Sequence, residues 1–438
     1  MSTDIAIVGS GAAGTLTAWR LRALLGDTAR LHVFECDQVG GRARHIEFAG
    51  ERVELGGTLI HTDNRRIVEL AAAVGLPLAP RRVEIPAGDG SIALWDGHGF
   101  LLRVPDSGLG LPLGLVRRYG PFNLLKLRRL AQRAKAAWNS VYALQEAGRV
   151  FETPDELIRA TGLDQFVKIS LTDLARRHGI SDKLVGQFVT GVLRDMYNQT
   201  SDIVALAGLV GLAGAGLAGG SLVASTEGNA TLFAQALDRI GADIRVPLAV
   251  TAVRSDDSGV TVTAGETCLT VDAVVLAAPL ELAGIEITTP DGPLPTATGR
   301  RYQDVHVTVV AGEAEPAFFG GGPTPGDVLT TADPDIGFKA FAQIGHSQAL
   351  AQPIWKFFSA EELSDDFLGR FFRRVAAVHH HLWQAYPVLT PDPSFHPFRL
   401  ARGVYQVNDF ESAVSTLETE ATIGWSVADL VARDLKRG

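Results

Sequence analysis

Glycines and small residues follow the first apolar stretch of the chain at a fixed spacing. Gly9, Gly11 and Gly14 form a G-x-G-x-x-G run. Gly9 allows a tight turn, Gly11 lets a phosphate approach the backbone, and Gly14 lets a helix pack closely on the preceding strand. That helix begins at Ala12 and Ala13, and its free N–H groups and positive dipole end favour a diphosphate. The run therefore predicts a dinucleotide site.

A carboxylate and a pair of adjacent glycines narrow the choice of nucleotide. Glu35 ends the next apolar stretch, about 20 residues after the last glycine, where a carboxylate accepts hydrogen bonds from ribose hydroxyls. Gly40 and Gly41 follow, and Arg42 offers a forked pair of donors to a diphosphate. Because a plain NAD fold would continue its crossover here, and because Glu35 would repel a 2′-phosphate, the pattern favours FAD. The alternative for Arg42 is a solvated surface arginine.

A second pair of adjacent glycines lies in a run that resembles a known family. Gly56 and Gly57, with Thr58, would let backbone amides reach a flavin ring. Together with Gly40–Arg42 they resemble the flavin amine oxidase superfamily. The longer run Glu54–Asn64 resembles the prenylcysteine oxidase (prenylcysteine lyase) family, which has an E-x-G-G-[ST]-x-I-H-x-x-N segment here. Further stretches fit that family in the same order over nearly the whole chain: Val192–Gln199, Leu329–Asp335, Trp355–Ser359, and Gly403–Glu418 with Gly424.

The resemblance implies a fold and a cofactor. The fold would be α/β, with a Rossmann-like FAD-binding domain of the glutathione-reductase-like type, amine-oxidase topology and an α+β substrate domain. Val250 would pass over the adenine, and the segment from Glu418 to Gly424 would face the isoalloxazine ring. No cysteine lies in that C-terminal loop, so the FAD would be bound non-covalently.

The resemblance also implies a reaction, which composition and spacing alone do not. FAD would take hydride from the carbon next to sulfur in an S-prenyl or S-alkyl cysteine. Water would add to that carbon, a thiol and an aldehyde would form, and molecular oxygen would be reduced to hydrogen peroxide. Two alternatives stay open. One is an oxidase or oxidative cyclase acting on an allylic C–H or C–N bond of a prenylated small molecule, and the other is a non-catalytic flavin-binding protein.

Several polar residues are candidates for a place near the ring. His61 follows Gly56 and Gly57 closely, which favours a place near the ring. The alternative is that His61 is a core histidine with satisfied hydrogen bonds. Arg194 could hold a substrate carboxylate with forked bonds, or form a structural ion pair with Asp195 or Asp202. Glu418 could contact the flavin or cap a helix. The candidates for catalysis are His61, Arg194 and Tyr197, with Asn198, Lys356 and Glu418 as further neighbours.

The length of 438 residues is too great for one ordinary core and predicts two domains that share a boundary. The predicted FAD-binding domain is discontinuous and comprises residues 1–75, 221–290 and 400–438. The predicted substrate-binding domain comprises residues 76–220, which include a helical block, and residues 291–399.

Two stretches raise the question of a membrane. Ile203–Gly220 is apolar throughout, but its glycines weaken a lone helix and no basic cluster flanks it. Buried packing beside the cavity is therefore favoured over a transmembrane span. Gly120–Ala147 has helical spacing and is basic, and a solvated face is favoured there over a surface for anionic lipid headgroups. Peripheral membrane contact remains an alternative, because lipid-like substrates are located in membranes.

Composition argues against several other classes of protein. The net charge of −9 and the lack of a long basic run argue against nucleic acid. Cys36 and Cys268 cannot form a disulfide framework, and the chain starts without an apolar leader, so a cytoplasmic location is expected. His379–His381 lie in a predicted helix, Glu361–Trp383, where consecutive side chains point about 100° apart. No metal site is therefore expected, and nothing indicates the oligomeric state.

Overall fold

The computed structural model of the chain describes residues 3–80, 90–105, 109–296, 299–331 and 336–437. Of the stretch Leu329–Asp335, the last four residues lie outside the described ones.

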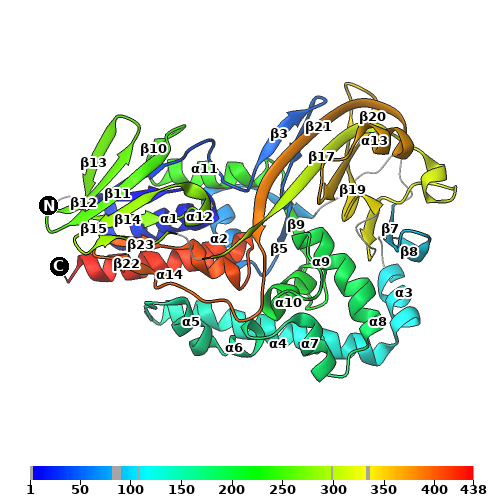
Figure 1. Ribbon diagram of the computed structural model, residues 1–438, viewed down its shortest axis with the longest axis horizontal. Helices are drawn as coiled ribbons and strands as arrows, with labels where there is room; N and C mark the ends of the chain where they lie inside the picture. Colours follow the sequence, from blue (N-terminus) through cyan, green and yellow to red (C-terminus); the bar gives the residue numbers. More distant parts are fainter. Residues whose placement is uncertain (1–2, 81–89, 106–108, 297–298, 332–335, 438) are drawn as a thin grey trace.

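A mostly parallel sheet joins strands from distant parts of the chain (Figure 1). β1 pairs in parallel with β2 on one side and β14 on the other, and β14 pairs in parallel with β23. β1 and β14 are apolar along most of their length and largely buried, as expected where both faces of a parallel sheet are covered. In the described residues the strand order is β10 (Asp243–Arg245), β2 (Ala29–Phe34), β1 (Thr3–Val8), β14 (Ala273–Leu276), β23 (Val404–Gln406) and β22 (Arg399–Ala401).

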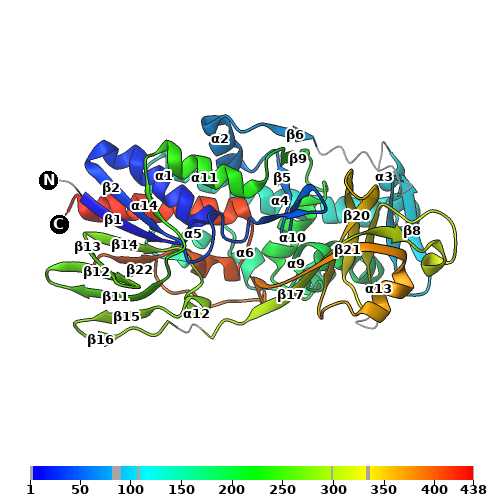
Figure 2. The ribbon, with the colours of Figure 1, turned by 90° about the horizontal axis from the view of Figure 1, so that it is seen from above.

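Helices cover one face of this sheet and a second sheet covers the other (Figure 2). The helices are α1 (Ala12–Leu25), α11 (Asn229–Arg239) and α14 (Leu417–Leu435), and α1 packs along α14. α2 (Arg65–Val74) packs on α11 and α14. The second sheet includes an antiparallel hairpin of β11 and β12, and it shares a buried apolar cluster with the first sheet. Its strands are β13 (Thr267–Val271), β12 (Gly259–Ala264), β11 (Val250–Asp256), β15 (Glu286–Thr289) and β16 (Gly292–Pro293), and α12 (Leu280–Ala283) follows β14. The predicted domain boundaries stay a prediction.

A further sheet and a block of helices make up the other half of the molecule (Figure 1). The described strands of this sheet are, in order, β21 (Phe372–Pro387), β17 (Tyr302–Ala314), β20 (Gln352–Ser359), β19 (Ala340–Ser347), β18 (Asp327–Thr330), β7 (Ser91–Trp95) and β8 (Phe100–Pro105). The helices are α3 (Gly110–Tyr119), α4 (Pro121–Glu146), α5 (Pro154–Thr161), α6 (Asp164–Val167), α7 (Leu171–Arg177), α8 (Asp182–Leu184), α9 (Thr190–Tyr197) and α10 (Ala205–Gly214). α4 confirms the helix predicted over Gly120–Ala147. Small sheets connect the halves: β3 (His45–Phe48) with β4 (Glu51–Glu54), and β5 (Leu59–His61) with β9 (Leu222–Ser225) and β6 (Leu78–Pro80).

The helix predicted over Glu361–Trp383 is wrong except for α13 (Asp365–Phe371). The rest is β21, which pairs with β17 along nearly its whole length. This pairing overrides the helix propensity of the Ala, Arg and Leu residues in the segment. On the strand, the rings of His379 and His381 stack with centroids 6.4 Å apart. In the described residues no group of three or more His, Cys, Asp or Glu side chains could hold a metal ion.

Most of the apolar stretch Ile203–Gly220 packs as predicted, with α10 buried in the helical block, whereas Ala215, Gly216 and Gly220 near its end are exposed. Gly208 allows this packing, because a Cβ there would lie 2.6 Å from Cδ2 of Leu171. In the part of the chain that the structure describes, no helix combines the length and apolar character needed to cross a membrane.

Candidate functional site

A cavity of about 700 Å³ extends from the end of β1 to the helical block. At one end it is lined by the glycine run and the ends of β2 and β11, and at the other by α4, α9, α10 and the seven-stranded sheet. Nearly all predicted cofactor residues line it: Gly9, Gly11, Ala12, Ala13, Glu35, Gly41, Arg42, Gly56, Gly57, Thr58, Val250 and Glu418. The exception is Gly14, which lies behind the wall.

The glycines at the first end leave the room that a dinucleotide needs. Gly9 has φ +103°, a left-handed value that favours glycine, and a Cβ there would lie 2.7 Å from the carbonyl oxygen of Ala277. A Cβ on Gly14 would overlap the carbonyl oxygen of Gly9, so α1 could not approach the strand. Gly11 faces the cavity with its nearest neighbours 3.7 Å or more away from a Cβ. The three predicted glycine roles therefore fit this geometry.

Glu35 follows β2 and contacts the glycine run through Ser10. Its Oε2 accepts hydrogen bonds from the backbone N–H and hydroxyl of Ser10, at 3.0 and 2.6 Å. Its Oε1 has longer contacts, with the Cys36 thiol at 3.5 Å and the Asp37 N–H at 3.3 Å. This second oxygen can accept a ribose hydroxyl. Val250 begins β11 beside it and lines the same end of the cavity.

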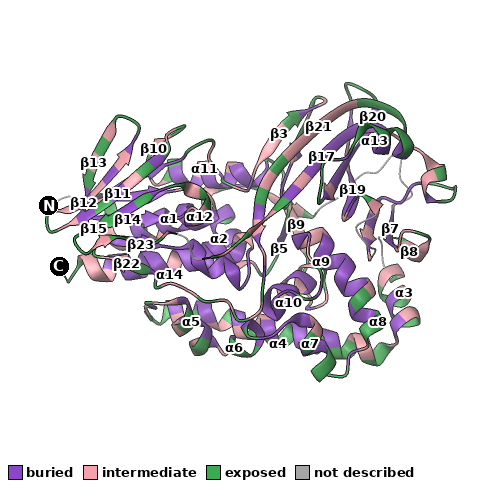
Figure 3. Ribbon diagram, in the orientation of Figure 1, coloured by how far each residue is buried: buried purple, intermediate pink, exposed green. Residues whose placement is uncertain are grey.

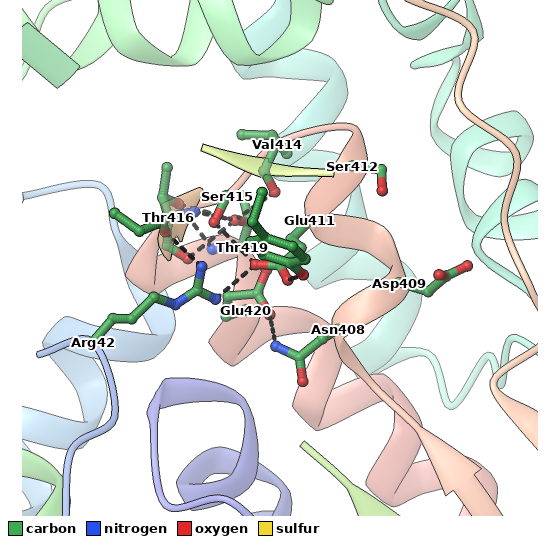
Figure 4. A network of polar contacts seen from close by, with 12 residues as sticks. Arg42, Asn408, Asp409, Glu411, Ser412, Val414, Ser415, Thr416, Thr419 and Glu420 are labelled. Atoms are coloured by element: carbon green, nitrogen blue, oxygen red, sulfur yellow. Dashed lines mark hydrogen bonds and ion pairs between the residues drawn. The ribbon is translucent and has the colours of Figure 1, made fainter. Parts of the chain in front are cut away.

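Arg42 joins the cavity wall to a buried polar network (Figure 4). Its Nη2 lies 2.6 Å from Oε2 of Glu411, which is fully buried, and its Nη1 donates to the carbonyl of Ala385 at 2.7 Å. Although burial opposes the charge, the carboxylates of Glu411 and Glu420 hold the pKa of Arg42 above its usual value. The side chain stays 31% exposed where it lines the cavity. The surface-arginine alternative is therefore wrong.

Glu420 is a buried carboxylate that the sequence reasoning missed. One of its oxygens accepts from the side-chain amide of Asn408 at 3.1 Å, while the other has no hydrogen-bond partner among the residues that the structure describes. Burial and then the charge of Glu411 raise the pKa of Glu420 well above its ordinary value. Glu420 lines the cavity. The signal available in the sequence was a set of acidic residues, among them Asp409, Glu411, Glu418 and Glu420, in a short C-terminal segment.

The glycine pair Gly56–Gly57 lies against β21. A Cβ on Gly56 would lie 2.8 Å from Cη2 of Trp383, whereas a Cβ on Gly57 would meet nothing within 4 Å. Lys356 on β20 donates from Nζ to the carbonyls of Glu54 and Gly56, each at 3.0 Å. A cationic group therefore reaches the backbone on which a flavin ring is predicted to lie.

His61 lines the cavity but both of its ring nitrogens have partners. Nδ1 accepts the backbone N–H of Asp63 at 3.1 Å, and Nε2 lies 2.8 Å from the carbonyl oxygen of Gly219. Together these contacts place the ring proton on Nε2. The geometry matches the satisfied-histidine alternative and leaves no ring nitrogen free for proton transfer.

Two predicted catalytic residues near the end of α9, Arg194 and Tyr197, differ in whether they line the cavity. Tyr197 lines the cavity, packs edge-to-face on Tyr386 with centroids 5.4 Å apart, and has a hydroxyl for which the described residues provide no hydrogen-bond partner. Arg194 does not line the cavity. It is buried and donates to the Thr330 hydroxyl at 2.9 Å and the Phe338 carbonyl at 3.4 Å. This placement is a correction to the prediction that Arg194 binds a substrate carboxylate.

Glu418 is occupied by the fold, which is a second correction. Its two oxygens accept the backbone N–H groups of Arg66 and Ile67 at 2.9 and 3.0 Å. The Tyr142 hydroxyl donates to it at 2.6 Å. Glu418 therefore caps the first turn of α2, and helix capping was the alternative to a flavin contact. Burial raises its pKa to about 7.

A charged pair lies where the cavity meets a second, more open hollow. Both are lined by Asp63, Lys135, Asn139 and Tyr142. The ammonium of Lys135 forms an ion pair with Asp63 and lies 3.4 Å from the carbonyl oxygen of Ala218. This boundary thus holds one charge of each sign beside a largely apolar interior.

Known proteins resemble this chain along nearly all of its length. The pattern of the prenylcysteine lyase family matches residues 112–438, and that of an NAD(P)-binding Rossmann-like domain matches residues 7–74. A farnesylcysteine lyase of Arabidopsis thaliana is 28% identical over 98% of this chain and 87% of its own. Prenylcysteine oxidase 1 of Mus musculus is 25% identical over 97% of this chain and 88% of its own. The solved cyclohexylamine oxidase of Brevibacterium oxydans superposes with a TM-score of 0.68 over 100% of both chains at 18% identity, which shows a shared fold.

Proposed function

Because the chain belongs to the prenylcysteine lyase family, we propose that it cleaves the C–S bond of an S-prenyl or S-alkyl cysteine. The products are a thiol and an aldehyde. The observation that supports this most directly is the continuous cavity, which joins the nucleotide end to an apolar chamber formed by α9, α10 and the seven-stranded sheet. Such a chamber suits a prenyl chain.

The cofactor is proposed to be non-covalently bound FAD. The glycine run, Glu35 and Val250 fit the adenosine diphosphate half, and the room at Gly57 fits the ring half. Both cysteines are free, and Cys36 lies at the nucleotide end. Bound FAD would supply a two-electron oxidant for the carbon next to sulfur, with molecular oxygen as the final acceptor, reduced to hydrogen peroxide.

The protein's own contribution is to orient the thioether, while water adds to the oxidised carbon and supplies the oxygen of the aldehyde. Leu209, Val210 and Ala213 of α10, with Tyr197 and Phe358 opposite, form the apolar wall against which a prenyl chain packs. The thioether carbon is oxidised without prior loss of a proton, so the site needs no general base. The occupied ring nitrogens of His61 agree with this.

The Lys135–Asp63 pair supplies a place for the amino-acid end of the substrate. Its ammonium and carboxylate match the carboxylate and ammonium of a cysteine, and a substrate that exchanges partners with the pair keeps every charge compensated. The thioether would then lie between the charged boundary and the prenyl chamber.

The test is an anaerobic mixture of the flavin-loaded protein with S-farnesyl-cysteine, in which the main visible flavin band is followed. Bleaching, with free thiol and aldehyde formed in equal amounts, is expected. A cyclic product that has lost two hydrogens would assign the oxidative-cyclase reaction instead. No bleaching of a flavin that dithionite still reduces would reject the thioether as substrate.

A further inference from the structure

We propose that α3 and the first half of α4 form a docking surface for an anionic lipid bilayer. The surface, called the α3–α4 face below, comprises the exposed side chains between Leu109 and Arg133. It lies at the end of the molecule opposite both chain termini (Figure 1).

Large apolar side chains gather on this face. Phe122 is 78% exposed, Leu109 70% and Leu113 62%, the highest values for large apolar residues in the described part of the chain. Val116 and Leu125 add to the same group. The spacing of Leu109, Leu113 and Val116 places them on one side of α3. The burial colours show exposed positions on α3 and along α4 (Figure 3). Such a patch marks an interaction site.

The charge of the segment identifies the partner. From Leu109 to Gln145 the sequence has seven basic residues and no acidic one, in a chain whose net charge is −9. Arg117, Arg128 and Arg129 are exposed, and within the described residues no ion pair or hydrogen bond occupies their guanidinium groups. Apolar side chains beside unpaired cations match the acyl boundary and anionic headgroups of a bilayer. A second copy of the same face would bring like charges together.

The same helix connects this face to the cavity. α4 carries Phe122 and Leu125 near its start, and Lys135, Trp138 and Tyr142 line the cavity further along. Leu125 and Trp138 are about 20 Å apart along the helix axis. A protein docked by this face would therefore hold its cavity close to a lipid surface.

The test measures co-sedimentation of the flavin-loaded protein with vesicles, with no substrate present, so it fails or succeeds independently of the proposed reaction. Vesicles of phosphatidylcholine mixed with phosphatidylglycerol are expected to bind the protein at low salt. Pure phosphatidylcholine vesicles bind it much more weakly, and high salt weakens the binding to the mixed vesicles. The double variant Val116→Ser/Arg117→Glu is expected to bind the mixed vesicles at least about tenfold more weakly.

A matched control is available on β21. Val375 is 41% exposed against 40% for Val116, and Arg374 beside it is exposed like Arg117. Val375→Ser/Arg374→Glu should bind vesicles like the wild type, and Phe122→Ser gives a second variant outside α3. Equal binding by all variants would overturn the proposal. The proposal would also be overturned if the wild type did not bind anionic vesicles. This holds whether the wild type is monomeric or forms a dimer that Phe122→Ser disrupts.

Discussion

At the residue scale, Arg42 serves both the fold and a ligand site. It compensates the charge of the buried Glu411, and it remains partly exposed to the cavity. A charged group in this position can meet a diphosphate without leaving its carboxylate partner, because the guanidinium has five N–H donors.

Arg42→Ala is expected to weaken FAD binding about tenfold or more, because a charge-assisted contact is lost. The FAD dissociation constant, measured by fluorescence quenching, tests this. Arg42→Lys keeps a charge for Glu411 and separates loss of the ligand contact from loss of the fold. Arg44→Ala is the control, since Arg44 pairs with Asp37 and does not line the cavity. Unchanged FAD affinity in Arg42→Ala would remove the assigned role.

Tyr197→Phe is expected to leave the free energy of unfolding unchanged or raise it by up to about 1 kcal/mol, because the buried hydroxyl has no partner to lose. If the hydroxyl contacts substrate, the same variant raises KM without changing FAD affinity. Tyr119→Phe is the contrast: it loses a hydrogen bond to Gln187 and should lower the free energy of unfolding by about 1 kcal/mol. Urea unfolding and steady-state kinetics of both variants provide the measurement. A clear loss of stability in Tyr197→Phe would contradict the expectation.

Glu418→Gln is expected to change how stability depends on pH. Burial raises the pKa of Glu418 from 4.5 to about 7 in the folded protein. The folded state therefore holds more protons than the unfolded state between these values. Wild-type stability falls as pH rises through this window, by about 3 kcal/mol in total. The variant lacks this loss, so its stability relative to wild type improves from pH 5 to pH 8.

Urea unfolding at both pH values and constant FAD concentration measures the effect of Glu418→Gln. Glu69→Gln serves as a control on an exposed carboxylate of α2. Parallel pH profiles for wild type and Glu418→Gln would show that the carboxyl does not titrate in this range.

Much of the nucleotide end could be predicted from residue types, and much of the chamber could not. Gly9 and Gly14 have roles fixed by backbone geometry, which a motif encodes locally. The directions of Arg194 and Glu418 depend on which distant element packs beside them. Arg194 meets Thr330 on β18, and Glu418 meets the start of α2. Neither contact leaves a local pattern.

At the element scale, β21 packs against Gly56 but not against Gly57, so the two neighbouring glycines should respond differently to substitution. Gly56→Ala is expected to lower the free energy of unfolding by about 1–3 kcal/mol, because its Cβ would press on Trp383 and on the carbonyl of Arg42. Gly57→Ala should leave the flavin-free protein unchanged but lower FAD affinity, since its Cβ would occupy the cavity. Thermal unfolding of flavin-free protein and FAD titration separate the two. Equal effects of both variants on the flavin-free protein would contradict the placement of β21.

Element types followed local signals where these were strong and failed where pairing decided. α4 has clear helical periodicity and was predicted. The segment of β21 has helix-favouring composition, and only its long pairing with β17 makes it a strand. Trp383 and Tyr386 were therefore missed as cavity residues.

At the scale of the whole molecule, one continuous cavity extends from the glycine run to the helical block, and we expect its different parts to bind the two halves of a dinucleotide. FAD is expected to raise the unfolding temperature of flavin-free protein more than equal concentrations of AMP or riboflavin, because it binds both ends at once. The adenosine end alone is altered by Glu35→Ala. This variant should remove most of the AMP effect and leave the riboflavin effect. A thermal-shift series with the three ligands measures this, and equal shifts from riboflavin and FAD would contradict it.

The position of α14 has a consequence for biosynthesis. Its Glu418 binds backbone groups of Arg66 and Ile67, more than 350 residues earlier, and the helix packs along α1. A ribosome-bound chain that still lacks this helix has neither the cap on α2 nor the wall beside the glycine run. We therefore expect cofactor loading only after α14 has been synthesised. A premature stop codon just before α14 should yield a colourless polypeptide.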